Sequence, residues 1–124
     1  MDVQQTLNNF WSGFGVPAYD ENSVPDEQYR VFPHITYDVV VGDTMDETAM
    51  SASIWTRSSQ WISAVQLYDA VNDALKNGGV VLPCDGGGLW IKKGSPWAQR
   101  LGDASDGSVK RILLNISVEF VTRN

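Results

Sequence analysis

The chain has 124 residues, one cysteine and a formal net charge of −6 at pH 7. A chain of this length buries about two thirds of the surface that its unfolded form exposes, so we expect one domain over residues 1–124. One cysteine excludes an internal disulfide, the acidic balance argues against general binding to nucleic acid, and no apolar run approaches the roughly 20 residues of a membrane helix. The N-terminal residues also lack a secretory signal pattern, so we expect a protein kept in a reducing cytoplasm.

Charge is distributed unevenly along the chain. Residues 1–56 contain nine acidic residues and one arginine, a balance of −8, so the remainder carries +2. This asymmetry is compatible with head-to-tail contact between copies of the chain. An acidic surface kept for solubility is the more common reason for such a pattern.

The first segment is predicted to be a short amphipathic helix with an aromatic stripe. Asp2 stands at the N-cap position, and Gly13 and Gly15 end the helix. We interpret the stripe as core packing rather than a ligand-binding aromatic box. Its members are Val3, Leu7, Phe10, Trp11 and Phe14. Residues 16–33 contain three prolines and four acids, and we expect an extended tether there, so that residues 1–33 are helix and tether.

Two segments with alternating apolar residues, 34–41 and 49–56, predict a β-hairpin. The connection between them carries Asp43, Asp46 and Glu47, and we expect a mobile acidic tip. These acids lack the ligand spacing and the glycine of a calcium loop, so the sequence predicts no metal site.

The longest predicted helix runs from a cap at Ser58 or Ser59 to Lys76, and Gly78 and Gly79 end it. We expect one stripe to lie across the apolar face of the sheet: Trp61, Val65, Tyr68, Val71 and Leu75. The polar positions expected to face outward are Gln60, Gln66, Asp69, Asn72 and Asp73.

A glycine-rich turn over residues 83–88 is predicted to join short strands at 80–82 and 89–92. The glycines precede a strand pattern rather than a helix, so they do not fit a phosphate-binding loop. Cys84 lies in this turn, and an enzyme using it as a nucleophile is a remote alternative. The only histidine, His34, begins a different strand, and no spacing joins it to Cys84.

Residues 94–107 are rich in turn formers and are predicted to form a surface loop. The following alternation, from Arg111 to Val121, predicts the cleanest strand of the chain. Its second face is half polar, which makes it a candidate for contact with another subunit. The whole pattern predicts an α+β fold: a mostly antiparallel sheet with two helices packed on one face, the sheet and long helix occupying residues 34–124.

Several segments, taken in order, carry a family resemblance. They are the N-terminal helix with VPAY at 16–19, then FPHITY at 32–37, SIWTRS at 53–58, GLWIKKGSPWAQR at 88–100 and RILLNISVEF at 111–120. In this order and spacing the chain resembles the tail terminator, or tail completion, proteins of long-tailed bacteriophages, which are often labelled minor capsid proteins. The resemblance covers nearly the whole chain, but no single segment is a specific motif.

The resemblance implies a tail-terminator-like fold and a structural virion protein without catalysis or cofactor, assembled in the bacterial cytoplasm and located at the head–tail junction. Copies would form a ring, a hexamer, that caps the tail tube, stops its polymerisation and presents a surface to the head connector. DNA would pass through without specific binding, and no membrane is involved. A head-completion adaptor that forms a ring on the portal side is the alternative. The candidate contact residues are Asp43, Asp46, Glu47, Trp90, Lys92, Lys93, Trp97 and Arg100.

Overall fold

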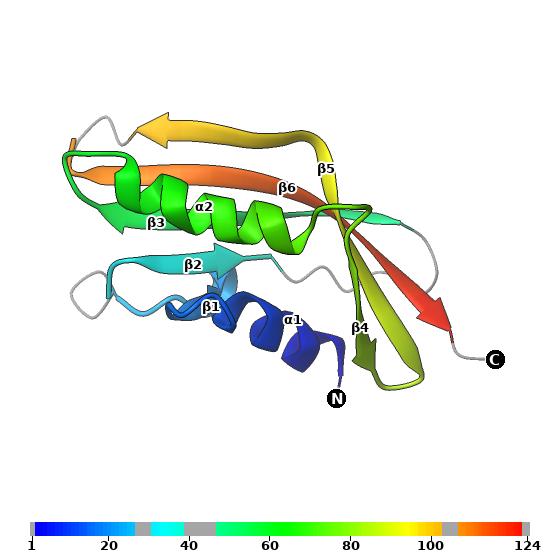
Figure 1. Ribbon diagram of the computed structural model, residues 1–124. Coiled ribbons are helices and arrows are strands. Elements are labelled where there is room, and N and C mark those ends of the chain that lie inside the picture. The colour runs from blue at the N-terminus through cyan, green and yellow to red at the C-terminus, as the bar shows by residue number, and fades with distance from the viewer. Residues whose placement is uncertain (1, 27–30, 39–46, 103–106, 123–124) are drawn as a thin grey trace.

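The computed structural model describes residues 2–26, 31–38, 47–102 and 107–122 (Figure 1). Within these residues the order of elements is α1 (Val3–Ser12), β1 (Ala18–Asp20), the short 3-10 helix η1 (Glu21–Ser23), β2 (His34–Tyr37), β3 (Thr48–Arg57), α2 (Ile62–Ala74), β4 (Val80–Cys84), β5 (Gly87–Gly102) and β6 (Val109–Thr122). The strands form one sheet in the order β1-β2-β3-β6-β5-β4. The first strand of the chain, β1, is therefore one edge of the sheet, whereas the last strand, β6, lies inside it.

The pairings join two hairpins through the long central strand β6. β2 pairs antiparallel with β3, and β4 pairs antiparallel with β5, as the alternation and the glycine turn predict. β6 lies antiparallel between β3 and β5. β1 pairs parallel with β2. Part of the predicted tether is thus a strand of the sheet, because residues 18–20 run alongside β2.

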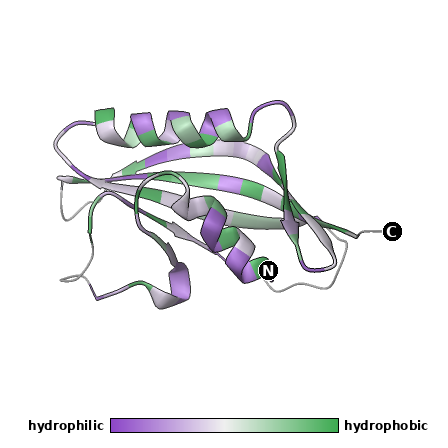
Figure 2. Cartoon of the chain, turned by 60° about the horizontal axis from the view of Figure 1, so that its bottom comes forward, coloured by the Kyte–Doolittle hydropathy of each residue, from purple (hydrophilic) through white to green (hydrophobic). Residues whose placement is uncertain are grey.

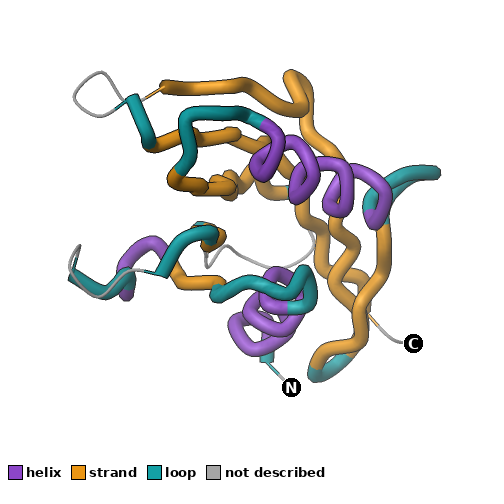
Figure 3. The backbone as a smooth tube through the Cα atoms, turned by 60° about the vertical axis from the view of Figure 1, so that its left-hand side comes forward, coloured by secondary structure: helices purple, strands orange, loops and turns teal. Residues whose placement is uncertain are grey.

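The sheet curls into a half-barrel, and both helices contribute to the core (Figure 3). Leu7 and Trp11 of α1 and Val71 and Leu75 of α2 are fully or almost fully buried in one cluster with strand residues. Along β6 the buried residues alternate with half-buried ones. Figure 2 shows both apolar and polar residues along the strands of the sheet. The strand members of this core are Ile35, Tyr37, Met50, Ala52, Ile54, Leu89, Ile91, Ile112, Leu114, Ile116 and Val118.

The predicted start of α1 is confirmed. The Asp2 side chain accepts a hydrogen bond from the Gln5 backbone N–H at 2.8 Å, and the Gln5 side chain accepts one from the Asp2 backbone N–H. This reciprocal pairing satisfies two backbone donors that a helix N-terminus otherwise leaves free. Trp11 is fully buried and lies edge-on to the ring of Phe10, so the aromatic stripe packs in the core.

The predicted serine cap of α2 is wrong. The helix begins at Ile62 after Trp61, which makes no side-chain cap bond, and Ser58 instead accepts from the backbone N–H of Gln60 in the preceding turn. The buried positions are Ala64, Val71 and Leu75, whereas Trp61, Val65 and Tyr68 are only half-buried. Trp61 and Tyr68 still pack against the buried cluster, so the stripe faces the core but is only partly covered.

The loop predicted from residue 94 is also wrong for residues 94–102, which belong to β5. Pairing with β6 holds from Gly87 to Lys93, breaks at a bulge, and resumes from Ala98 to Gly102. A Cβ at Gly94 would lie 2.9 Å from the carbonyl oxygen of Asn115, so only glycine allows this close approach. Gly94 and Pro96 lie within the bulge, and pairing with β6 on both sides of it keeps this segment in one strand.

Candidate interaction surface

Four of the predicted contact residues on β5, all except Trp90, lie along a basic edge of the sheet. β4 covers β5 only between Gly87 and Ile91, so the stretch from Lys92 to Gly102 has β6 on one side and no described strand on the other. We call this stretch the basic edge. Lys93 and Arg100 pair with the core residues Ile116 and Ile112, so both extend from the core-facing side of the sheet, whereas Trp90 and Lys92 extend from the other.

Trp90 and Lys92 form a cluster with Glu47. The indole N–H of Trp90 donates to the carbonyl oxygen of Gly78 at 2.8 Å, and the Lys92 ammonium lies 4.0 Å above the indole ring. Lys92 also lies 3.3 Å from a Glu47 carboxylate oxygen, which accepts a hydrogen bond from Ser117. The hydroxyl of Ser117, and then Lys92, lower the pKa of Glu47. The structure therefore brings three predicted contact residues, Glu47, Trp90 and Lys92, together, which their spacing in the sequence did not indicate.

Trp97 connects the basic edge to α2. Its indole N–H lies 3.1 Å from both the Tyr68 hydroxyl and the Asn72 side-chain oxygen. Asn72 is predicted to face outward, but this contact shows that it faces Trp97 instead. The Lys93 ammonium lies 5.5 Å from the centre of the Trp97 ring, and the Arg100 guanidinium lies 5.3 Å from that of Trp61. Trp61 and Trp97 are thus half-buried rings, and each lies beneath a cation.

The predicted acidic residues Asp43 and Asp46 lie outside the residues that the structure describes. A different acidic region is described at the opposite end of the sheet, where β1 and η1 (residues 18–23) form what we call the acidic edge. Asp20 accepts a hydrogen bond from the Asn22 backbone N–H at 3.0 Å. Among the described strands, β1 has a neighbour only on the β2 side.

Glu21 on this edge shares a proton with Asp38 at the end of β2. A hydrogen bond to Asp38, together with burial and the Asp38 charge, raises the pKa of Glu21 to about 7. The same hydrogen bond lowers the pKa of Asp38, whose carboxylate also accepts from the Ser51 hydroxyl at 2.7 Å. The charge of the acidic edge therefore changes near neutral pH.

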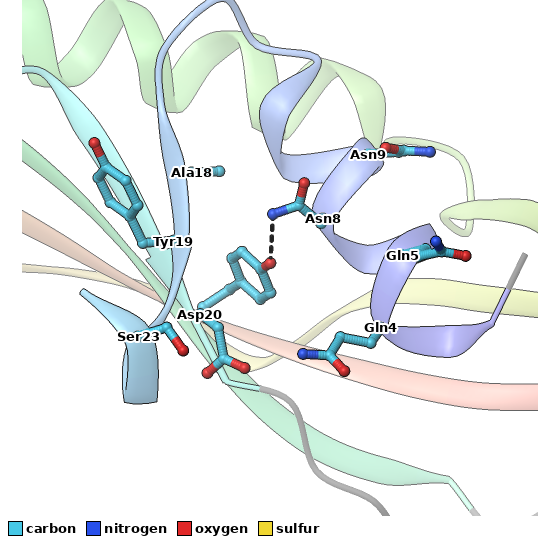
Figure 4. A pocket seen from close by; sticks show the side chains of 9 residues that line it. Gln4, Gln5, Asn8, Asn9, Ala18, Tyr19, Asp20 and Ser23 are labelled. Carbon is cyan, nitrogen blue, oxygen red and sulfur yellow. Dashed lines mark hydrogen bonds between the residues drawn. The ribbon is translucent and has the colours of Figure 1, made fainter. Parts of the chain in front are cut away.

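An open polar groove of about 830 Å³ lies between α1 and the acidic edge. Figure 4 shows Gln4 and Asn8 on the α1 wall and Asp20 and Ser23 on the facing wall. Asn8 donates from its amide to the Tyr37 hydroxyl at 2.7 Å. The groove, which we call the amide groove, is lined by Gln4, Gln5, Asn8, Asn9, Ala18, Tyr19, Asp20, Ser23 and Tyr37.

Sequence reasoning missed the amide groove. The available signal was the run of carboxamides at positions 4, 5, 8 and 9, which share one side of a helix. The aromatic stripe on the other side of this helix predicts core packing, and the polar side carries no prediction of its own. The facing wall cannot be predicted from the sequence, because β1 lies within the segment that is predicted to be an extended tether.

The structure does not bring Cys84 and His34 together. Three strands, β3, β6 and β5, separate β2 from β4 in the sheet order. Burial, and then the charge of Asp85, raise the pKa of the Cys84 thiol, which disfavours the reactive thiolate. His34 is buried, and its Nδ1 lies 2.9 Å from the Val31 carbonyl oxygen.

Neither a cluster of metal ligands nor a membrane-spanning helix is found within the described parts of the chain. No group of three or more histidine, cysteine, aspartate or glutamate side chains there is arranged to hold a metal ion. No helix there combines the length and the apolar character needed to span a bilayer.

Comparison with solved structures found a similar chain in the virion of a native gene transfer agent (GTA) particle. The TM-score is 0.58 at 20% sequence identity, and the match covers 96% of this chain and 91% of the other. The two chains share one fold. No family model and no curated protein sequence matches this chain.

Proposed function

We propose that this chain is a structural protein of a phage-like virion, and that it is a tail terminator. The observation that carries the proposal is the fold shared over nearly the full length with a chain of a gene transfer agent virion. The order of segments that resembles tail terminator proteins supports the same proposal and narrows it to the end of the tail.

Copies of the chain would associate into a closed ring, a hexamer. The charge asymmetry of the sequence supports this arrangement, because the sheet order puts the acidic edge at one end and the basic edge near the other. Contacts between two different surfaces of identical copies are head-to-tail, and they close into a ring when the rotation between copies allows it. Opposite charges on the two surfaces favour this pairing over contact between like edges.

The ring would act by occupying the last layer of the tail tube. Tube subunits would then lack a surface on which to add, while the opposite face of the ring would receive the head connector. No chemical step is needed. DNA would pass through the centre without specific binding, and Trp90, Lys92, Lys93, Trp97 and Arg100 would contribute to contacts with neighbouring copies or with the tube.

The test is to mix the purified chain with tail tubes assembled without it, and separately with tailless heads, and to view both by electron microscopy. We expect a ring at one end of each tube, and capped tubes that no longer elongate when tube protein is added. Uncapped tubes in the same preparation are the elongation control. Binding to heads but never to tubes would contradict the terminator role and support a head-side adaptor.

A further inference from the structure

We propose that the amide groove receives the basic edge of the adjacent copy, so that each copy holds residues 93–101 of its neighbour between α1 and β1. This inference rests on the proposed ring and names the two surfaces that build it. Within one copy the two surfaces belong to opposite ends of the strand order.

The chemistry of the groove suits an extended peptide. Carboxamides both donate and accept hydrogen bonds, which is what the N–H and C=O groups of a peptide backbone require. Gln4 and Asn8 supply such groups from α1, and Ser23 adds a hydroxyl from the facing side. Asn8 is held in place by its bond to Tyr37, so part of this surface is fixed before a ligand arrives.

The backbone of β1 offers a second mode of recognition. Its three residues pair with β2 on one side, and the groove lies along the same strand. A strand edge of this kind takes an additional extended segment through main-chain hydrogen bonds. The basic edge is already extended, and beyond the bulge its residues Ala98, Gln99 and Arg100 are exposed.

Charge selects the occupant. Lys93 and Arg100 extend from the core-facing side of β5, each over an aromatic ring that leaves its charge in place. The groove wall carries Asp20, and on the same edge Glu21 is hydrogen-bonded to Asp38, whose lowered pKa keeps that partner negative. A cationic segment is therefore attracted into the groove, and an acidic segment is repelled.

Cross-linking tests the contact directly. In a Cys84→Ser background, Gln4→Cys is combined with Ser95→Cys or with Gln99→Cys in the same chain, and tube-bound protein is treated with a short bismaleimide. A head-to-tail contact joins each copy to the next, so we expect a ladder that extends to the full ring. A mixture of chains that each carry one of the two cysteines should stop at dimers. Gln4→Cys with Ser63→Cys, which is exposed on α2, is the control and should give no ladder.

A charge exchange gives an independent readout. Asp20→Lys alone and Arg100→Asp alone should each weaken self-association at least about tenfold, since like charges then face each other. The chain carrying both substitutions should recover most of the loss. Circular dichroism of each variant reports whether it is folded. Rings that form and cap tubes with no ladder and no recovery would overturn this inference and leave the proposed function standing, whereas tubes that never acquire a ring would overturn both.

Discussion

The two edges of the sheet differ in how they are built. The acidic edge is a strand of three residues with a polar groove beside it, supported by a helix whose Trp11 is fully buried. The basic edge is the far part of a strand of sixteen residues, interrupted by a bulge and supported by half-buried tryptophans. One edge therefore depends on the packing of a separate helix, and the other on a long ladder with β6. Substitutions should affect the two edges unequally.

Removing the support of the acidic edge should have the largest effect. Trp11→Ala empties a fully buried site in the core, so we expect the free energy of unfolding to fall by about 3–5 kcal/mol. Chemical denaturation measures the change. Trp90→Ala on β5 is the matched control, and we expect about 1–2 kcal/mol because that ring is already half-exposed. Equal losses would contradict the difference between the edges.

Next in size is the turn that leads from α2 to the strands bearing the basic edge. Gly79 has φ +93°, and a Cβ there would lie 2.1 Å from the carbonyl oxygen of Ile91. We expect Gly79→Ala to cost about 2–3 kcal/mol in denaturation experiments. Gly78 also has a positive φ, but open space surrounds its Cβ position, so Gly78→Ala should cost only about 1 kcal/mol. Similar costs for the two variants would show that the contact with β5 is looser than described.

A smaller effect is expected where the basic edge meets α2. Trp97→Phe leaves the Tyr68 hydroxyl and the Asn72 oxygen without their indole donor, which should cost about 1–2 kcal/mol. Trp11→Phe is the comparison, because the buried indole nitrogen of Trp11 has no hydrogen-bond partner within the described residues. If Trp11→Phe lowers the free energy of unfolding by more than its reduced volume accounts for, then losing an indole N–H is costly at both sites, and the polar role assigned to Trp97 is not specific to the basic edge.

The smallest effect concerns the pH dependence of the acidic edge. The pKa of Glu21 is raised in the fold from its ordinary value of 4.5 to about 7, so the folded chain holds more protons than the unfolded chain between these values. This contribution to stability is fully present below pH 4.5 and is lost as pH rises through 7. Asp38, whose pKa is lowered, acts only in more acidic solution.

Glu21→Gln keeps a hydrogen-bond donor toward Asp38 without the ionisation. We expect it to flatten the change in stability between pH 5 and pH 8 and to stabilise the chain at pH 8 by less than about 1 kcal/mol, because the site is exposed. Urea denaturation at the two pH values measures this. Glu119→Gln on β6 is the control and should leave the slope unchanged, and an unchanged slope in Glu21→Gln would contradict the shared proton.

The parts of the fold that sequence predicted well are those in which local chemistry and tertiary packing agree. Asp2 followed by Gln5 is a local capping pattern, and the spacing of Leu7 and Trp11 reports burial directly. The pairing of β2 with β3 follows from alternation over a short connection. Each of these signals is carried by residues close together in the chain.

The parts that sequence did not predict depend on distant segments. Gly94 and Pro96 favour a turn locally, yet pairing with β6 before and after them keeps them within β5 as a bulge. The candidate surface shows the same limit. Glu47, just before β3, and Lys92 on β5 meet across the intervening strand β6, and Gln4 becomes part of a groove only because β1 lies opposite α1. The carboxamides of α1 share one face of the helix, but nothing in the sequence places β1 opposite them.

The central claim is that identical copies associate through the two unlike edges. A cryo-electron microscopy reconstruction of the chain at the end of a tail tube tests it most directly. We expect a closed ring in which the acidic edge of every copy faces the basic edge of the next, related by one rotation. A two-fold dimer that joins like edges, or a ring in which both edges face solvent, would contradict the account.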